Sequence, residues 1–173
     1  DFSGIAKGHA VDRVSERLTA MGATSHLIEI GGELRGAGVK PDGQPWWVEI
    51  EQAPGSPAPR TLIALIDIAM ATSGDYRRVF SHDGQRYSHT LDGRTGRPID
   101  NGLASVTVVH PSAMKADAFA TALSVMGAAD GREFAEDYGL AAHFVERTPQ
   151  GAVEHMTPLF AAMLEDQDEQ QDV

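Results

Sequence analysis

The segment spanning residues 105–127 constrains the fold more than any other part of the sequence. Residues 105–109 are mostly β-branched and apolar, which predicts a buried strand. Pro111 ends this strand, and Ser112 is a favourable N-cap for a helix predicted over 113–126. The glycine that follows suits the position just after a helix. The segment therefore predicts a strand and a helix joined by a tight connection.

Two polar side chains share one face of this helix. Asp117 and Thr121 are four residues apart, so a carboxylate lies one turn from a hydroxyl, among small alanines. A hard cation such as Mg²⁺ prefers oxygen ligands on a rigid support, and this pair supplies two. In the alternative, Asp117 is a solvated helix charge and Thr121 bonds back to the carbonyl at position 117. Spacing alone favours that alternative.

Composition excludes several classes of function. The 173 residues are enough for one domain with its own core, and 42% of them are hydrophobic. A net charge of −11 argues against nucleic acid as a partner and against adsorption to an anionic membrane. The sequence has no cysteine, which excludes thiol catalysis, disulfides and thiolate zinc sites, and is compatible with an extracytoplasmic location. It has no signal peptide and no apolar run long enough to span a bilayer.

The first residues combine a helix start with a positive charge. The sequence opens with Asp1 and has no initiator methionine, so we expect it to be part of a longer protein. A helix is predicted over residues 5–21, and the free N–H groups at its start suit a phosphate or another anion. Lys7, one turn into the helix, would reach the same ligand.

The rest of the chain consists of short strands and turns. A glycine pair at 31–32 ends one predicted strand and permits a bulge or the close approach of a ligand. Adjacent strands joined by tight turns predict an α+β fold, a mostly antiparallel sheet with helices packed over it. We expect residues 1–164 to form this domain and the acidic residues 165–173 to be disordered. Strands are predicted at 26–30, 33–39, 46–51, 62–71, 78–80, 85–89, 141–146 and 152–156. A helix is predicted at 130–138. Loops that are polar or interrupted by glycine are predicted at 72–77 and 90–98.

Five motifs occur in a fixed order along nearly the whole chain. They are Asp1-x-x-Gly4-Ile-Ala-Lys-Gly8, Ile30-Gly-Gly-Glu33, Ala71-Thr-Ser-Gly-Asp-Tyr76, Tyr87-Ser-His-Thr-Leu-Asp92 with Thr95-Gly96, and Ala116-Asp-Ala-Phe-Ala-Thr-Ala122. Together they resemble the C-terminal half of the ApbE family, the FAD:protein FMN transferases. Three positions depart from the usual family pattern: Ser3 and His9 replace Gly and Tyr, and Gly93 replaces Pro.

This resemblance implies a reaction and a set of ligands. The family splits FAD with Mg²⁺ and transfers FMN to a Thr hydroxyl of a target flavoprotein, releasing AMP. It implies Asp117, Thr121 and the backbone carbonyl of Gly4 as metal ligands. It also implies a periplasmic location, a lipoprotein anchor outside this sequence, and an N-terminal half that completes the flavin pocket. The implied cofactor-binding residues are Asp1, Lys7, Gly31, Gly32, Ser73 and Leu91.

His89 is the predicted general base. The acceptor Thr must lose a proton as it attacks phosphorus, and imidazole titrates near neutral pH. The alternative is a strand histidine that bonds its neighbours. Asp92 either orients His89 or caps the following turn, and Ser73, Tyr76 and Arg77 either line the substrate face or are ordinary turn residues. Six other histidines lie outside the catalytic-looking motifs: His9, His26, His82, His110, His143 and His155.

Two other functions are compatible with the sequence. One is a Mg²⁺-dependent FAD pyrophosphatase, which would pass the phosphoryl group to water and yield FMN and AMP. The other is a flavin-binding module without catalysis. The residues do not separate these alternatives from transfer, because the difference lies in how the acceptor is admitted.

Overall fold

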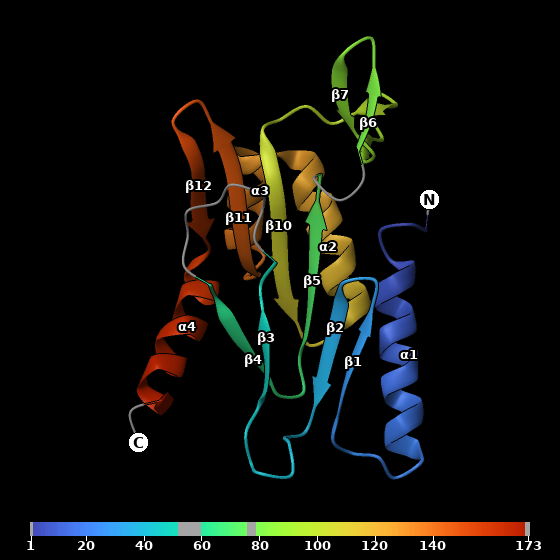
Figure 1. Cartoon of the computed structure of the whole chain (residues 1–173), viewed down its shortest axis with the longest axis vertical. Helices are drawn as coiled ribbons and strands as arrows, with labels where there is room; N and C mark the ends of the chain where they lie inside the picture. The colour runs from blue at the N-terminus through green and yellow to red at the C-terminus, as the bar shows by residue number, and fades with distance from the viewer. Residues whose placement is uncertain (1, 52–59, 76–78, 172–173) are drawn as a thin grey trace.

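A six-stranded antiparallel sheet forms the centre of the molecule (Figure 1). The computed structural model describes residues 2–51, 60–75 and 79–171. Every pair of neighbouring strands in the sheet is antiparallel, which confirms the predicted fold class. In spatial order the strands are β1 (His26–Ile30), β2 (Glu33–Ala37), β5 (Ala69–Gly74), β10 (Leu103–His110), β11 (Ala141–Thr148) and β12 (Gly151–Met156).

Helices and a second strand pair cover the two faces of this sheet. The face that carries Val106 and Val108 packs against α2 (Ala113–Met126) and α3 (Ala128–Asp137). Next to them, α1 (Ala6–Ala20) covers β1 and β2. The opposite face, which carries Met70 and Val109, packs against α4 (Pro158–Gln171) and the pair β3 (Trp46–Glu49) and β4 (Leu62–Leu65). The domain therefore has three layers.

The alternating direction of side chains along each strand determines which of them contact the helices. Successive side chains of a strand point to opposite faces, so in β5 Met70 and Ser73 lie on different sides of the sheet. Ser73 shares the helix-covered side with Ala71, whose side chain packs in the core beneath α2. In β2, Glu33 and Arg35 likewise face α1, where they bond Lys7 and Asp12. The polar residues of the candidate site are thus carried on the helix-covered face.

A small hairpin projects beyond the end of the sheet (Figure 1). Its strands are β6 (Val79–His82) and β7 (Gln85–Ser88), and its turn has positive φ at Asp83 (51°) and Gly84 (76°). This confirms the predicted hairpin, since an Asp-Gly pair tolerates two positive φ angles in a two-residue turn. The predicted loop 90–98 contains one further ladder, between β8 (Leu91–Asp92) and β9 (Arg97–Pro98).

The single strand predicted over 62–71 is wrong, because the chain turns at Asp67. This residue has a φ of 55°, and its Oδ1 accepts a hydrogen bond of 2.9 Å from the Gly38 backbone N–H. The apolar run is thereby divided between β4 and β5, which belong to different sheets. The predicted loop at 72–77 is wrong for 72–74, since β5 continues there and pairs with β10.

Two helices differ in extent from the sequence-based expectation. Helix α3 begins at Ala128 instead of residue 130, and α4 continues to Gln171, into the segment for which the sequence predicts disorder. Glu and Gln are good helix formers, which is consistent with this extension. Among the described residues, no helix combines the length and the apolar character needed to cross a membrane.

Candidate functional site

The site begins where α1 crosses α2 at very short range. A side chain on Gly8 would place its first carbon 2.2 Å from the carbonyl oxygen of Ala113, so only glycine permits this approach. At the crossing, the Gly8 backbone N–H donates to Asp117 Oδ2 over 3.0 Å. Asp117 is only 3% exposed. The alternative of a solvated helix charge at Asp117 is therefore wrong, because α1 covers that face of α2.

A second carboxylate from α1 fixes the start of α2. Asp12 accepts hydrogen bonds from the backbone N–H groups of Ala113 (2.9 Å) and Met114 (3.0 Å) and from the Ser112 hydroxyl (2.7 Å). Partial burial raises the pKa of Asp12, but these hydrogen bonds and the charge of Arg35 outweigh it, so the pKa lies below the usual Asp range. The predicted N-cap Ser112 is confirmed, since its Oγ accepts from the Lys115 N–H at 3.3 Å. Asp12 thus aligns the helix that carries Asp117.

Thr121 meets two other segments of the chain. Its Oγ1 is hydrogen bonded to the hydroxyl of Ser73 on β5, with 3.2 Å between the oxygens. A side chain on Gly4 would start 2.9 Å from the same Oγ1, so the backbone before α1 lies directly against Thr121. The three predicted metal ligands, Gly4, Asp117 and Thr121, therefore gather between α2 and the segment that leads into α1.

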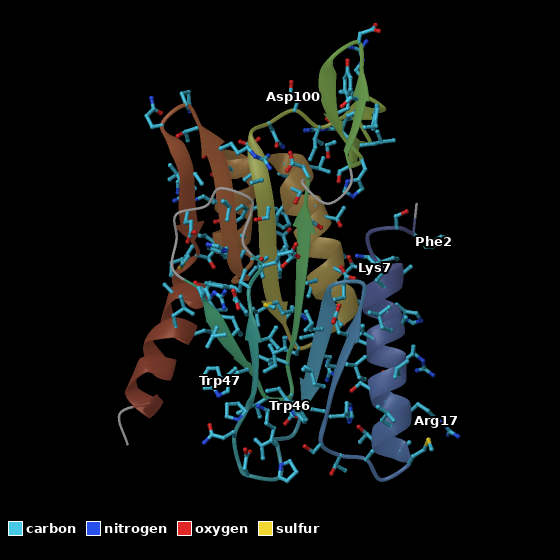
Figure 2. The ribbon with its side chains drawn as sticks, viewed as in Figure 1. Phe2, Lys7, Arg17, Trp46, Trp47 and Asp100 are labelled. Carbon is cyan, nitrogen blue, oxygen red and sulfur yellow. The ribbon has the colours of Figure 1, made fainter. Side chains whose placement is uncertain are left out.

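Lys7 forms a partly buried ion pair with Glu33. Its Nζ donates to Glu33 Oε1; the lysine side chain is 44% exposed and the glutamate side chain 1%. Figure 2 places Lys7 near the start of α1. Gly31 lies against this pair: a Cβ there would be 3.2 Å from the Lys7 stem, and its φ is +64°. Gly31 and the half-buried Gly32 form the turn between β1 and β2, which holds the chain beside Lys7.

The charges of this cluster are suited to a divalent cation. Two buried carboxylates, Asp117 and Glu33, face one ammonium, that of Lys7, so negative charge is in excess. Burial raises the pKa of Glu33, the charge of Asp117 raises it further, and the bond from Lys7 opposes both. Glu33 Oε2 is buried and has no hydrogen-bond partner among the described residues. Carboxylate, hydroxyl and carbonyl oxygens are the ligands Mg²⁺ prefers, so the residues present fit this ion.

His89 lies on a different segment, between β7 and β8, and is exposed. Its neighbour Thr90 lines a small cavity together with Ser73, which connects this segment to the cluster around Thr121. Asp92 caps the following turn: its Oδ1 accepts from the Arg94 backbone N–H at 2.9 Å. Of the two roles open for Asp92, the structure therefore supports the turn cap. Leu91 is 56% exposed. Asp1, Tyr76 and Arg77 lie outside the described residues.

Most of the other histidines make structural contacts. His26 bonds Ser15 at 2.8 Å and the Ala23 carbonyl at 2.9 Å, and both bonds hold the start of β1 against α1. His143 and His155 pair with Glu154 (3.1 Å) and Glu146 (3.3 Å) across the β11–β12 hairpin. His110 accepts from the Ser112 backbone N–H at 2.9 Å. His9, which directly follows Gly8 on α1, is exposed, as is His89.

A large groove lies away from this cluster. It encloses about 900 Å³ between the second half of α1, β2 and the start of α2, and its lining includes Asp12, Arg35 and Asp67 but none of the predicted site residues. Within the described part of the chain, no three His, Asp or Glu side chains gather as a metal centre. The set formed by Asp117, Thr121 and Gly4 differs from such a centre, because two of its three oxygens come from a hydroxyl and a carbonyl.

Comparison with known proteins decides the family. The model of the ApbE family matches residues 1–144. The chain belongs to the ApbE family. The resemblance seen in the five motifs is thereby confirmed, and with it the fold.

Several ApbE proteins are similar to this chain over most of its length. The FAD:protein FMN transferase of Haemophilus influenzae is 41% identical over 167 residues, which cover 95% of this chain and 48% of the relative. That of Vibrio cholerae is 43% identical and covers 95% and 49%. The crystal structure of apo flavinyl transferase ApbE from Pseudomonas stutzeri gives a TM-score of 0.84 at 46% identity, over 95% of this chain and 51% of that one. The chain spans about half the length of the ApbE relatives it matches.

Two elements of this ApbE site were missed from the sequence. The motif Ile30–Glu33 contains Glu33, but no role was predicted for this residue from the sequence. Its signal was the position of a carboxylate directly after a glycine pair at the end of a strand. The Gly8 backbone N–H has no sequence signal as a donor to Asp117, since the two residues are 109 positions apart. Both contacts depend on the docking of α1.

Proposed function

We propose that this chain carries the metal and phosphate part of a FAD:protein FMN transferase. In this reaction FMN passes from FAD to a Thr hydroxyl of a target flavoprotein, and AMP is released. The observation that carries the proposal is the gathering of Gly4, Asp117 and Thr121 beside the ammonium of Lys7. The names of the relatives, FAD:protein FMN transferase and flavinyl transferase, support the same assignment.

The cluster offers separate groups for the metal and for the phosphates. Asp117, Thr121 and the Gly4 carbonyl would hold Mg²⁺, which when bound supplies positive charge next to the pyrophosphate. Lys7 would donate to a phosphate oxygen, since its side chain is 44% exposed and the free N–H groups at the start of α1 also favour an anion. The Gly31–Gly32 turn permits the nucleotide to approach the backbone. Ser73 and Leu91 are the remaining proposed FAD contacts.

His89 would act as the base toward the acceptor. Its exposed imidazole takes the proton of the Thr hydroxyl, whose oxygen forms a new bond to the FMN phosphorus. The bond between that phosphorus and the bridging oxygen breaks, and AMP leaves with the bridging oxygen. The products are a phosphoester-linked FMN, AMP and one proton. Exposure of His89 suits this role, because a protein acceptor must reach it from outside.

A single incubation tests this proposal. The purified protein is mixed with FAD, Mg²⁺ and a target protein or peptide with an acceptor Thr, and AMP, free FMN and covalently bound flavin are measured. Transfer predicts equal amounts of AMP and flavin-labelled target. AMP with free FMN and no labelled target would identify a pyrophosphatase, and FAD binding without AMP would identify a binding module. A target with Thr replaced by Val is the matched control. The proposed periplasmic, membrane-anchored location is tested separately by fractionation of the cells that produce the protein.

A further inference from the structure

Glu33 is a buried carboxylate to which the reaction just described assigns no role. It is the first residue of β2, and its side chain is 1% exposed. Burial of an ionised group is costly unless the group is paired, so a buried glutamate in a small domain requires an explanation. Among the described residues, the one bond that it makes to another side chain is the ion pair with Lys7. Replacement of both partners by apolar residues would avoid this cost, which indicates that the charges serve a purpose beyond packing.

The surroundings of Glu33 hold Lys7 in one position. The lysine stem passes over Gly31, where a Cβ would approach it to 3.2 Å, and its Nζ ends on Glu33 Oε1. The second oxygen, Oε2, lies 3.8 Å from the same Cβ position and has no partner among the described residues. A free lysine samples many rotamers, so this anchor removes conformational freedom before any ligand binds.

The same turn of α1 contacts both buried carboxylates. Lys7 reaches Glu33 with its side chain, and Gly8, the next residue, reaches Asp117 with its backbone N–H. The partly exposed Lys7 side chain is thereby held on the same helix turn that contacts Asp117, the proposed metal ligand. A pyrophosphate that is bound to a cation at Asp117 would lie within the reach of this lysine.

We infer that Glu33 is a positioning residue, which fixes the Lys7 ammonium where it meets the phosphates of FAD. This inference rests on the proposed function. Glu33 itself does not touch the ligand: its buried carboxylate acts through Lys7. The affinity for the phosphate-bearing part of the ligand therefore depends on Glu33, whereas the affinity for the flavin ring does not.

The test compares two ligands on three variants. Equilibrium titrations measure the Kd of FAD and of riboflavin, which lacks phosphate, at saturating Mg²⁺, together with Tm. Glu33→Ala should weaken FAD binding about tenfold, the effect of one lost charge-assisted hydrogen bond, and leave riboflavin binding unchanged. Glu33→Gln keeps the side-chain length and an acceptor oxygen, so its FAD affinity should fall only about threefold. Glu16→Ala is the control: it removes the partner of Arg13 on the same helix, a pair that is 66% and 61% exposed, and should change neither Kd.

Each contrary outcome has a defined meaning. An unchanged FAD affinity in folded Glu33→Ala overturns the inference, as does an equal loss for FAD and riboflavin that follows the loss of Tm. If Glu33→Ala does not fold, Glu33→Gln decides, and an unchanged ratio of the two affinities overturns the inference. A protein that binds FAD but labels no target refutes the proposed transfer while the role of Glu33 stands. If a wild-type protein that includes the expected N-terminal half binds no FAD, both proposals are overturned.

Discussion

The hydroxyls of Ser73 on β5 and Thr121 on α2 lie 3.2 Å apart, so the sheet and the helix meet through a polar contact at the candidate metal site. A hydroxyl oxygen has two lone pairs and one proton, and Ser73 occupies only one of these directions. Thr121 therefore retains a lone pair for a cation. Gly4 also lies close to this oxygen, since a Cβ on Gly4 would be 2.9 Å from Thr121 Oγ1.

Thr121→Val tests this ligand with almost no change of shape. We expect Mg²⁺ binding, measured by calorimetric titration in the presence of FAD, to weaken about tenfold, since a neutral hydroxyl contributes less than a carboxylate. Thr72→Val on β5 is the control, because it also removes a hydroxyl–hydroxyl contact, the 2.9 Å bond to Thr107, but leaves Ser73 and the Thr121 oxygen in place. Equal metal affinities for wild type and Thr121→Val would remove Thr121 from the ligand set.

Asp117→Asn should abolish Mg²⁺-dependent cleavage of FAD. The amide retains an acceptor oxygen for the Gly8 N–H but loses the negative charge, so the fold should persist while activity falls more than about a hundredfold. Asp117→Ala would also leave the Gly8 N–H unsatisfied and lower the free energy of unfolding by about 1–3 kcal/mol. AMP release by Asp117→Asn at the wild-type rate, with saturating Mg²⁺, contradicts the assignment.

His89→Asn separates catalysis from binding. FAD and Mg²⁺ should bind as in the wild type, whereas single-turnover transfer of FMN should fall by about 10²–10⁴-fold, the usual effect of losing a general base. A structural role for His89 predicts instead that Tm falls in proportion to activity. A stable variant that transfers FMN normally would exclude the base.

Asp12 should make stability depend on pH. Its pKa is lower in the folded chain than in the unfolded chain, so the unfolded chain binds more protons in acid. The contribution of Asp12 is complete above the ordinary Asp pKa and is lost as pH falls through the folded value. Asp12→Ala should cost about 1–2 kcal/mol near neutral pH, as for a lost helix cap. The Tm difference from wild type should be constant above about pH 5 and should shrink as pH falls below about pH 4, the ordinary Asp pKa. A pH-independent difference would contradict this account.

Local patterns were sufficient to predict the fold class and to place the two proposed metal ligands of α2 on one helix face. Apolar alternation and tight turns give antiparallel strands, and the spacing of Asp117 and Thr121 places both on one helix face whatever packs against it. The break at Asp67 was not visible, because an apolar run continues across it and the positive φ is held by a contact with Gly38. Tertiary packing, not the local sequence, determines where this strand breaks.

Burial of Asp117 was missed for a related reason. A helix face rich in alanine looks open in sequence, but small side chains also permit another helix to approach closely, and here Gly8 on α1 occupies the space. Asp12 caps a helix that begins 101 positions later, a pairing that no local signal encodes. The residues that align the site are therefore harder to predict than the ligands themselves.

The crossing at Gly8 has a thermodynamic consequence. The Gly8 N–H and the Lys7 ammonium both come from one turn of α1. A local opening of that helix would therefore break the contacts with Asp117 and with Glu33 at the same time. A ligand that needs these contacts must therefore favour the docked helix, and its binding free energy adds to the free energy of opening. Hydrogen exchange at the Gly8 amide should slow as the fraction of ligand-bound protein rises. The exchange rate of this one proton would therefore report the fraction of the protein that has ligand bound.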